Sequence, residues 1–444
     1  MGAFKAYDIR GIYNRDFDKE FVYKVGYFLT TLLQADVVAI GRDVRLSSDE
    51  IFSALSQGII DSGCDVWDIG LATTPMVYFA TVHLGVKASV QITASHNPAI
   101  YNGLKISRQG ALPVGQDSGL KELEEMVNSG TITVKEKKGK IVAKPVKEAY
   151  LEFLRPYVGD FSALNITVDL SHGMANLIAK DLLGSQPNYL YDHLDGTFPA
   201  HEPNPLDEGN LVDIKAAVKA NRSDIGVIFD GDADRVMFIT EEGEFIQPDY
   251  ITALIGEYYL SREKGTVLQD IRTSRSTTEH LEELGGEVVT WKVGHAFAKL
   301  KLRQIGGIFG GELAGHYYFR DFFHCDSGML AALLVLQSTV KLKQAGKSLS
   351  AWLKDLVVYA NSGELNYKLG QKDAAMQALY EKYRALEPSK ILDFDGYRIE
   401  FPSWWFNVRK SNTEPYLRLV VEAKNRELLE AKVKELTAVI ESFK

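Results

Sequence analysis

The chain has little cysteine, proline or uninterrupted apolar sequence, and each shortage excludes a class of protein. Its 444 residues include only two cysteines, Cys64 and Cys325, which excludes a disulfide framework or a Cys-rich zinc site and is typical of a reducing cytoplasm. Thirteen prolines and 37 glycines are too few for collagen or a low-complexity linker. No run reaches the roughly 18 apolar residues of a membrane span, and the first residues lack the apolar core of a signal peptide. We therefore expect a cytoplasmic protein without a membrane partner.

An excess of positive charge is also missing. The 50 basic and 59 acidic residues leave a formal net charge of −9, which argues against a general nucleic-acid partner. Hydrophobic residues make up 45% and charged residues 25% of the chain, as in ordinary globular proteins and unlike disordered ones. The length favours two to four domains, at about 100–200 residues per domain.

Strand-like apolar runs alternate with helix-length segments up to about residue 360. This alternation is typical of βαβ units, and three successive series of it predict three related α/β domains. The predicted strands are residues 37–40, 66–69 and 90–93 in the first series, 166–170, 189–191 and 225–229 in the second, and 266–268, 288–291 and 308–309 in the third.

The last 80 or so residues follow a different pattern, typical of an α+β domain. Helical spacing covers residues 374–386 and 426–443, and a strand is expected at 417–421. Two further strands, 391–394 and 397–401, flank Asp395-Gly396, a strong signal for a two-residue hairpin.

Polar breaks near residues 135–144, 241–243 and 361–363 suggest the boundaries between these domains. The predicted organisation is therefore α/β domains at 1–145, 146–242 and 243–360, followed by a smaller α+β domain at 361–444.

A polar loop, residues 93–98, directly follows the third predicted strand. Ser95 would lie at the carboxyl end of that strand, where open α/β sheets place their ligands. Asn97-Pro98 then forces a turn. A plain strand-to-loop turn with a capping serine explains the segment equally well when it is taken alone.

Three carboxylates alternate in the segment 230–235, at Asp230, Asp232 and Asp234. They can converge on one hard cation, and a set of oxygen ligands suits Mg²⁺ or Ca²⁺. An EF-hand is excluded because Arg235 occupies the position that requires glycine and because both flanks are strand-like. A solvated acidic turn is the remaining alternative, but it would leave three close carboxylates with only Arg235 to offset them.

Two later loops offer polar groups to a ligand, although a glycine-rich turn with a surface Glu and His and a solvated polar loop are the respective alternatives. Residues 310–316 are glycine-rich and present Glu312 and His316, and a carboxylate is well suited to accept hydrogen bonds from hydroxyls. Residues 409–415 combine Arg409, Ser411, Asn412 and Thr413, which can together bind a phosphate. Their spacing is not that of a P-loop.

Taken together and in this order, the four loops resemble those of the α-D-phosphohexomutase superfamily, and most closely its phosphomannomutase/phosphoglucomutase group. The segments 4–11 and 41–43 extend the resemblance over nearly the whole chain. It implies three related α/β domains with mixed sheets and a smaller α+β domain, arranged around a central cleft to which each contributes one loop.

The resemblance also implies roles for individual residues. Ser95 is similar to the serine that carries a phosphoryl group, and Ser95 with Asp230, Asp232 and Asp234 resembles the Mg²⁺ ligands. Arg10 and Lys105 fall at catalytic positions. The positions similar to substrate-binding ones are Tyr7, His96, Arg235, Arg272, His295, Glu312, His316, Arg409, Ser411, Asn412 and Thr413.

The reaction implied is a reversible shift of phosphate between O1 and O6 of a hexose, with hexose 1,6-bisphosphate as intermediate and activator. The net charge of three aspartates, a phosphoserine of charge about −2 and one Mg²⁺ is roughly −3. About three nearby cations are therefore expected to offset it. Arg10, Lys105 and Arg235 match that number. Lys105, Arg10 or His316 is expected to assist removal of the hydroxyl proton.

The sequence departs from the common pattern at Ala314, Val293 and Arg272, where many members have Ser, Thr and Lys. These changes bear on sugar preference, so mannose and glucose phosphates are expected as partners with glucosamine phosphate as the alternative. A Mg²⁺-dependent phosphatase with Asp230 as nucleophile, or a binding protein without catalysis, are the competing functions. The chain is expected to be a monomer or a homodimer.

Overall fold

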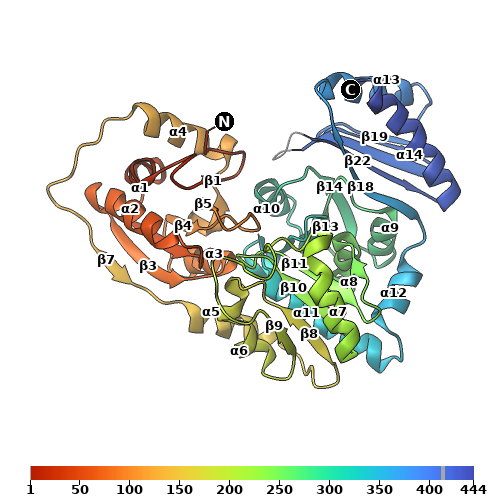
Figure 1. The fold of residues 1–444 in the computed structure, drawn as a ribbon, viewed down its shortest axis with the longest axis horizontal. Helices are drawn as coiled ribbons and strands as arrows, with labels where there is room; N and C mark the ends of the chain where they lie inside the picture. The colour runs from red at the N-terminus through yellow and green to blue at the C-terminus, as the bar shows by residue number, and fades with distance from the viewer. Residues whose placement is uncertain (1, 412–415) are drawn as a thin grey trace. The chain divides into compact units, whose positions relative to one another are not determined.

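The computed structural model describes residues 2–411 and 416–444, which divide into two compact units (Figure 1). Unit 1 comprises residues 2–247 and 314–350, and unit 2 comprises 248–313 and 351–444. Helix α12 (Leu349–Leu356) contains the last boundary.

The first sheet of unit 1 has the strand order β1-β5-β4-β2-β3-β7, with β6 paired to β5. Its central strand β4 is buried at every position, as expected for a strand covered on both faces. The elements of this region are β1 (Ile9–Ile12), α1 (Lys19–Leu33), β2 (Val37–Arg42), α2 (Ser48–Asp61), β3 (Asp65–Leu71), α3 (Thr74–His83), β4 (Ala88–Ile92), β5 (Tyr101–Arg108), β6 (Leu112–Pro113), α4 (Leu120–Ser129) and β7 (Ile141–Ala143).

The second sheet of unit 1 has the order β12-β11-β10-β8-β9. The remaining elements of unit 1 are α5 (Lys147–Leu154), β8 (Ile166–Asp169), α6 (Ala179–Leu183), β9 (Asn188–Leu190), α7 (Val212–Asn221), β10 (Ile225–Phe229), β11 (Val236–Thr240), β12 (Phe245–Ile246), the antiparallel pair β16 (Tyr317–Phe319) and β17 (Cys325–Asp326), and α11 (Gly328–Gln344).

Unit 2 contains one α/β region and one α+β region. The first has α8 (Pro248–Leu260), β13 (Thr266–Asp270), α9 (Arg275–Glu283), β14 (Glu287–Trp291), α10 (His295–Gln304) and β15 (Phe309–Gly311). The second is a five-stranded sheet of order β18-β22-β21-β20-β19. Its elements are β18 (Ala360–Lys368), α13 (Lys372–Arg384), β19 (Lys390–Leu392), β20 (Tyr397–Phe401), β21 (Trp404–Lys410), β22 (Tyr416–Ala423) and α14 (Arg426–Glu441).

The same strand pairing occurs three times along the chain, which confirms the three predicted α/β series. In each series the first strand lies between the other two and is parallel to both. The three sets are β3-β2-β4, β9-β8-β10 and β14-β13-β15. In the first two sets the next strand, β5 or β11, returns antiparallel, so the sheets are mixed.

Strand periodicity divides the C-terminal sheet into an apolar and a polar face. Trp404, Phe406 and Val408 of β21 join a core with residues of α13 and α14, which lie on that face (Figure 1). Successive side chains of a strand point to opposite faces. Asn407 and Arg409 therefore lie on the other face, where both are nonetheless buried.

The structure refines three details of the sequence prediction. The expected linker 135–144 ends in β7, which pairs with the edge of β3. The expected break at 361–363 lies inside β18 and is only a bulge, whose Ser362 hydroxyl accepts a hydrogen bond from the Val421 N–H. The hairpin at Asp395-Gly396 forms, but Leu392 pairs with Arg398, so its loop is longer than two residues.

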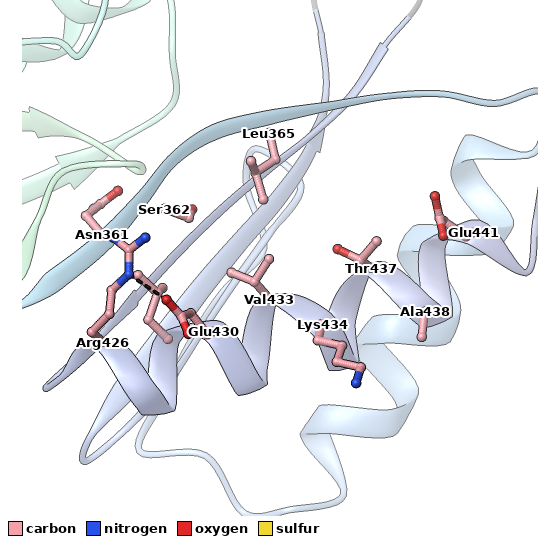
Figure 2. A pocket seen from close by; sticks show the side chains of 11 residues that line it. Asn361, Ser362, Leu365, Arg426, Glu430, Val433, Lys434, Thr437, Ala438 and Glu441 are labelled. Carbon is pink, nitrogen blue, oxygen red and sulfur yellow. Dashed lines mark hydrogen bonds and ion pairs between the residues drawn. The ribbon is translucent and has the colours of Figure 1, made fainter.

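A groove of about 560 Å³ lies between β18 and α14 on the surface of the C-terminal region (Figure 2). Its walls mix apolar side chains such as Val433 with an ion pair between Arg426 and Glu430. Within the residues that the structure describes, every helix is too short or too polar to span a membrane.

Candidate active site

The loop after β4 presents Ser95 in a strained conformation. Ser95 has a φ of +52°, in the left-handed region that a side chain with Cβ rarely adopts. Its N–H donates to Thr93 Oγ1 over 2.9 Å, and its side chain is 2% exposed. Such strain is typical of functional sites when the surroundings enforce it.

The three aspartates occupy the turn that joins the antiparallel strands β10 and β11. Phe229 pairs with Val236, so residues 230–235 form a tight loop, and all three carboxylates are fully buried. Gly231 is required there, since a Cβ at this position would lie 2.6 Å from the Ser95 carbonyl oxygen. The sequence of the turn therefore brings the aspartates against the serine loop.

The structure brings Ser95 and the aspartates into direct contact. The Ser95 Oγ donates to Asp230 Oδ2 over 3.0 Å. Lys105 Nζ lies 2.7 Å from Asp232 Oδ2 and 2.5 Å from Asp234 Oδ2. The fold of unit 1 therefore places both Lys105 and the serine loop against the acidic loop.

These carboxylates fit a divalent cation. One oxygen from each of Asp230, Asp232 and Asp234 lies within 4.8 Å of the others. Among the residues that the structure describes, none donates a hydrogen bond to the buried Asp232 Oδ1 or Asp234 Oδ1, although a buried carboxylate oxygen normally has a partner. An all-oxygen donor set suits Mg²⁺ or Ca²⁺, so the residues present can hold such an ion.

Burial and mutual repulsion dominate the electrostatics of this cluster. Burial, followed by the charges of Asp232 and Asp234, raises the pKa of Asp230 well above its ordinary value. Burial acts against the Lys105 ammonium, but the charges of Asp232 and Asp234 outweigh it and raise the Lys105 pKa. Without a further cation the three carboxylates are therefore not readily ionised together.

The other predicted cations of unit 1 lie around the same loop. Arg235 Nε is 3.2 Å from Asp230 Oδ2, and its Nη2 approaches Ser95 Oγ at 3.4 Å and also contacts His96. Arg10 donates to Asn97 Oδ1 over 2.7 Å and to Asp8 Oδ2 over 2.5 Å. Tyr7 is half-buried just ahead of β1.

His316 is placed in unit 1 by an isolated bridge with Arg235. Its Nδ1 lies 2.6 Å from Asp326 Oδ2 and 4.0 Å from Asp234 Oδ1. Since an ionised carboxylate only accepts hydrogen bonds, this contact places the proton of the neutral ring on Nδ1. Sequence reasoning did not find Asp326, which lies in a short strand without a recognisable motif.

Unit 2 gathers the predicted sugar-binding residues on the loops after β13, β14 and β15. Glu312 Oε1 accepts from the Gly294 N–H over 2.6 Å, beside His295 at the start of α10. Arg272 is almost fully buried and contacts Asp270 at 2.8 Å and Glu364 at 3.1 Å.

Arg409 is held by the hairpin loop of the C-terminal region. Its Nε is 3.1 Å from Asp395 Oδ1, and Asp395 Oδ2 accepts from the Val293 N–H. Arg409 Nη2 is buried without a hydrogen bond to the described residues. Ser411 follows with its N–H bonded to the Tyr416 carbonyl, whereas the predicted residues Asn412 and Thr413 lie outside the described residues.

Two positioning contacts were missed by the sequence analysis. The Thr74 hydroxyl donates to Asp232 Oδ2 over 2.5 Å from the start of α3, and Arg45 donates to the backbone of the serine loop. The signals available were a Thr-Thr-Pro helix start after a strand and an arginine two residues beyond Asp43.

The chain matches four models of one protein family in succession. They are the phosphoglucomutase/phosphomannomutase α/β/α domain I at residues 1–133, domain II at 148–243, domain III at 247–359 and the C-terminal domain at 364–439. The chain is also 37% identical over 464 aligned residues to a phosphomannomutase of Vibrio cholerae, covering 100% of this chain and 99% of that protein.

A second relative supports the same class. Phosphohexose mutases of Xanthomonas campestris are 38% identical over 450 residues, with 99% of each chain covered. The fold and these matches define an enzyme of the phosphohexomutase class, whose members are isomerases. The chain belongs to the phosphoglucomutase/phosphomannomutase family, which confirms the resemblance and the fold predicted from the sequence.

Solved structures agree with this assignment. A phosphoglucomutase/phosphomannomutase family protein from Burkholderia thailandensis superposes with a TM-score of 0.88 at 29% identity, covering 99% of this chain and 97% of that one. A putative phosphomannomutase from Thermus thermophilus has a TM-score of 0.81 at 23% identity, covering 99% and 100%, and at that identity it shows the fold alone.

Proposed function

We propose that the enzyme moves a phosphoryl group reversibly between O1 and O6 of a hexose phosphate, through a phosphoserine at Ser95 and a hexose 1,6-bisphosphate. One observation carries the proposal: the Ser95 Oγ lies 3.0 Å from Asp230 in a buried cluster of three carboxylates. A hydroxyl beside a divalent-cation site, on a strained loop, is suited to hold a phosphoryl group in transit.

Ser95, Asp230, Asp232 and Asp234 would hold Mg²⁺ in this proposal. The bound ion would neutralise charge on the transferring phosphoryl group, as in other phosphoryl-transfer enzymes. The two buried aspartate oxygens without hydrogen bonds, Asp232 Oδ1 and Asp234 Oδ1, are the natural donors to it.

The surrounding cations complete the charge balance. Lys105 and Arg235 contact the carboxylates directly, and Arg10 reaches the serine loop through Asn97. When the phosphoryl group moves from Ser95 to the sugar hydroxyl, the bond to Ser95 Oγ breaks as the bond to the sugar oxygen forms. Fixed positive groups stabilise the charge that spreads over the phosphoryl oxygens during this exchange.

A base must accept the proton of the attacking hydroxyl. Lys105 has a raised pKa and Arg10 is always charged, so both are better suited to stabilise charge than to accept a proton. His316 remains the candidate base, since the neutral ring carries its proton on the nitrogen that faces Asp326.

The residues of unit 2 would hold the sugar and the phosphate that is not being transferred. Arg409 presents a buried Nη2 that makes no hydrogen bond to the part of the chain that the structure describes, as an anion-binding arginine would. Glu312 would accept hydrogen bonds from sugar hydroxyls that are present in both orientations, so that the bisphosphate can turn around and donate its other phosphoryl group. Such a site tolerates both mannose and glucose.

The proposal keeps the predicted segments 1–145, 146–242, 243–360 and 361–444 as domains that supply one loop each. Hexose phosphates are the proposed partners and Mg²⁺ the proposed cofactor, in a cytoplasmic setting.

The main alternatives are a phosphatase that uses Asp230 as nucleophile, a phosphoglucosamine mutase and a binding protein that has lost catalysis. The first leaves Ser95 and the loop of Arg409 without a role.

Labelled mannose 1-phosphate distinguishes these functions. A mutase retains the ³²P label in mannose 6-phosphate, a phosphatase releases it as inorganic phosphate, and a binding protein does neither. Intact mass should show one phosphoryl group on the purified enzyme, and Ser95→Ala should lose both this group and turnover while still binding the sugar phosphate. Full activity of Ser95→Ala would refute the proposal.

A further inference from the structure

Arg45 lies beneath the serine loop with all of its donors engaged. The side chain is 2% exposed. Its Nη2 donates to the carbonyls of Ser95, at 2.8 Å, and Asn97, at 2.6 Å. Its Nη1 donates to the carbonyls of Pro98, at 2.7 Å, and Tyr101, at 3.0 Å.

The fifth donor completes the set. Arg45 Nε donates to Asp43 Oδ2 over 3.1 Å, and a guanidinium has five N–H donors in a fixed planar fork. Four of them therefore hold backbone carbonyls between residues 95 and 101, while the fifth ties the fork to a buried carboxylate.

Asp43 is itself fixed. Its Oδ1 accepts from the Arg45 N–H over 3.0 Å and from the Ser48 hydroxyl over 2.6 Å, and its own N–H bonds to the Ile92 carbonyl at the end of β4. The Phe198 ring covers the guanidinium at 5.0 Å. The guanidinium is thus anchored to the ends of β2 and β4, and the serine loop begins at the end of β4.

We propose that Arg45 is a positioning residue that sets the backbone of the serine loop, and through it the place of the Ser95 Oγ, for phosphoryl transfer. This inference rests on the proposed role of Ser95. Its polar contacts are to the loop backbone and to Asp43, so it acts on the reaction through the loop and not by touching the phosphoryl group.

The reason is the strain of the loop. Ser95 adopts a φ of +52°, and a residue held in this region needs surroundings that enforce it. Lysine would keep the charge of Arg45 but cannot reproduce four directed bonds to carbonyls. Displacing a reacting group by about 1 Å can reduce turnover about 100-fold.

The test compares Arg45→Lys with Arg42→Lys as a matched control. Arg42 belongs to the same segment, but its guanidinium contacts Asp49 and Asp68 on the periphery. We expect kcat of Arg45→Lys to fall about 100-fold, with KM for hexose phosphate and the Mg²⁺ midpoint within about threefold of wild type. The control should retain wild-type kcat.

Chemical rescue separates positioning from general destabilisation. Guanidinium ion at millimolar concentration should restore part of the kcat of Arg45→Ala and none of that of Ser95→Ala. If Arg45→Ala does not fold, the milder Asp43→Asn should show the same selective fall in kcat, reduced in size. Thermal unfolding of each variant establishes whether it is folded at the assay temperature.

Three outcomes would overturn the inference: wild-type kcat in Arg45→Lys, a loss of Mg²⁺ affinity or KM that matches the loss of kcat, or no response of Arg45→Ala to guanidinium. These differ from failure of the proposed function, which would appear in the wild type as the absence of a phosphoryl group on Ser95 and of mutase activity.

Discussion

At the scale of single residues, the acidic loop concentrates charge that the protein alone does not neutralise. Three buried carboxylates face two contacting cations, Lys105 and Arg235. Two of the carboxylate oxygens accept no hydrogen bond from the described residues. A bound divalent ion would both offset the negative charge and bind the two oxygens. Metal affinity should therefore be the property most sensitive to these side chains.

Asp232→Asn should therefore weaken Mg²⁺ binding. An amide has one acceptor oxygen and no charge, so we expect the Mg²⁺ concentration for half-maximal activity to rise at least about tenfold. Titration of activity and calorimetric Mg²⁺ binding measure it. The exposed Asp117→Asn should leave both values unchanged, and an unaltered titration in Asp232→Asn would remove this loop from the metal site.

Asp249 at the start of α8 gives the fold of unit 2 a pH dependence. Burial raises its pKa from 3.8 to about 7, although the N–H groups of Ser274 and Tyr250 donate to it. The folded state holds this proton where the unfolded chain has lost it. Stability from this group is therefore lost as the pH rises from about 4 to about 7.

Asp249→Asn removes this titration while keeping the shape of the side chain. The unfolding free energy of wild type relative to the variant should fall by about 1.4 kcal/mol per pH unit between roughly pH 5 and 7, and should level off above. Chemical denaturation at a series of pH values measures this difference. A constant difference would contradict it, and the exposed Asp393→Asn provides the baseline.

At the scale of elements, the start of α3 supports the acidic loop. Thr73 caps the helix by accepting from the Met76 N–H, and the next residue, Thr74, uses its hydroxyl and its N–H to bind Asp232. Because Thr73 already caps the helix, Thr74 is available to orient Asp232, a proposed metal ligand.

Thr74→Val tests this support. It removes a hydrogen bond to a charged group, worth about 1.5–3 kcal/mol, and should weaken Mg²⁺ binding about tenfold, as is typical for partners of metal ligands. Thr74→Ser keeps the hydroxyl and should bind Mg²⁺ like wild type. If both variants bind alike, the hydroxyl does not orient Asp232.

The elements and their contacts also show what the sequence could and could not predict. The strands of the α/β series were predictable as short apolar runs, which are most continuous where a strand is buried at every position, as in β4 and β10. The proximity of Ser95 to Asp230 was implied by the family resemblance, whereas the two motifs taken alone predicted only a polar loop and a cation site. The role of Arg45 was not predicted because it donates mainly to backbone carbonyls, and such contacts leave no pattern of side chains in the sequence.

Local signals also failed where distant contacts decide the backbone. The hairpin loop widens around Asp395, whose carboxylate binds Arg409 and the Val293 N–H. Gly396 has a close neighbour, since a Cβ would lie 2.1 Å from the Val408 carbonyl oxygen. Neither contact is visible in the dipeptide that predicted a two-residue turn.

At the scale of the whole molecule, the same strand pairing occurs three times, and each copy carries a candidate site loop at the end of the same strand. The serine loop follows β4 and the acidic loop follows β10, the third strands of the first two series, while the Glu312 loop follows β15, the third strand of the last. Equivalent strand ends thus carry different chemistry, and a change of sugar specificity need not disturb phosphoryl transfer.

Sugar preference is expected to be broad for this reason. Mannose 1-phosphate and glucose 1-phosphate should react with kcat/KM values within about tenfold of each other, equivalent to about 1.4 kcal/mol, because a site that binds the sugar in two orientations cannot give every hydroxyl its own partner. Glucosamine 1-phosphate should react more slowly. Parallel assays primed with hexose 1,6-bisphosphate measure this, and a preference for glucosamine would favour the alternative mutase.

The separation of tasks between the units predicts separable kinetic effects. Arg409 in unit 2 would bind the phosphate that is not transferred, and its planar fork is suited to two phosphate oxygens where lysine offers only a point charge. Arg409→Lys should therefore raise KM for the hexose phosphate about 10- to 100-fold, the equivalent of losing about 1.5–3 kcal/mol.

The same variant should leave the groups of unit 1 intact. With saturating bisphosphate, the Mg²⁺ midpoint and the phosphoryl occupancy of Ser95, measured by intact mass, should equal those of wild type. The adjacent Lys410→Ala is the matched control, because Lys410 lies on the exposed side of β21 and pairs with the exposed Asp373. A fall in Mg²⁺ affinity in Arg409→Lys with an unchanged KM would contradict the separation, because it would assign Arg409 to the metal and not to the distal phosphate.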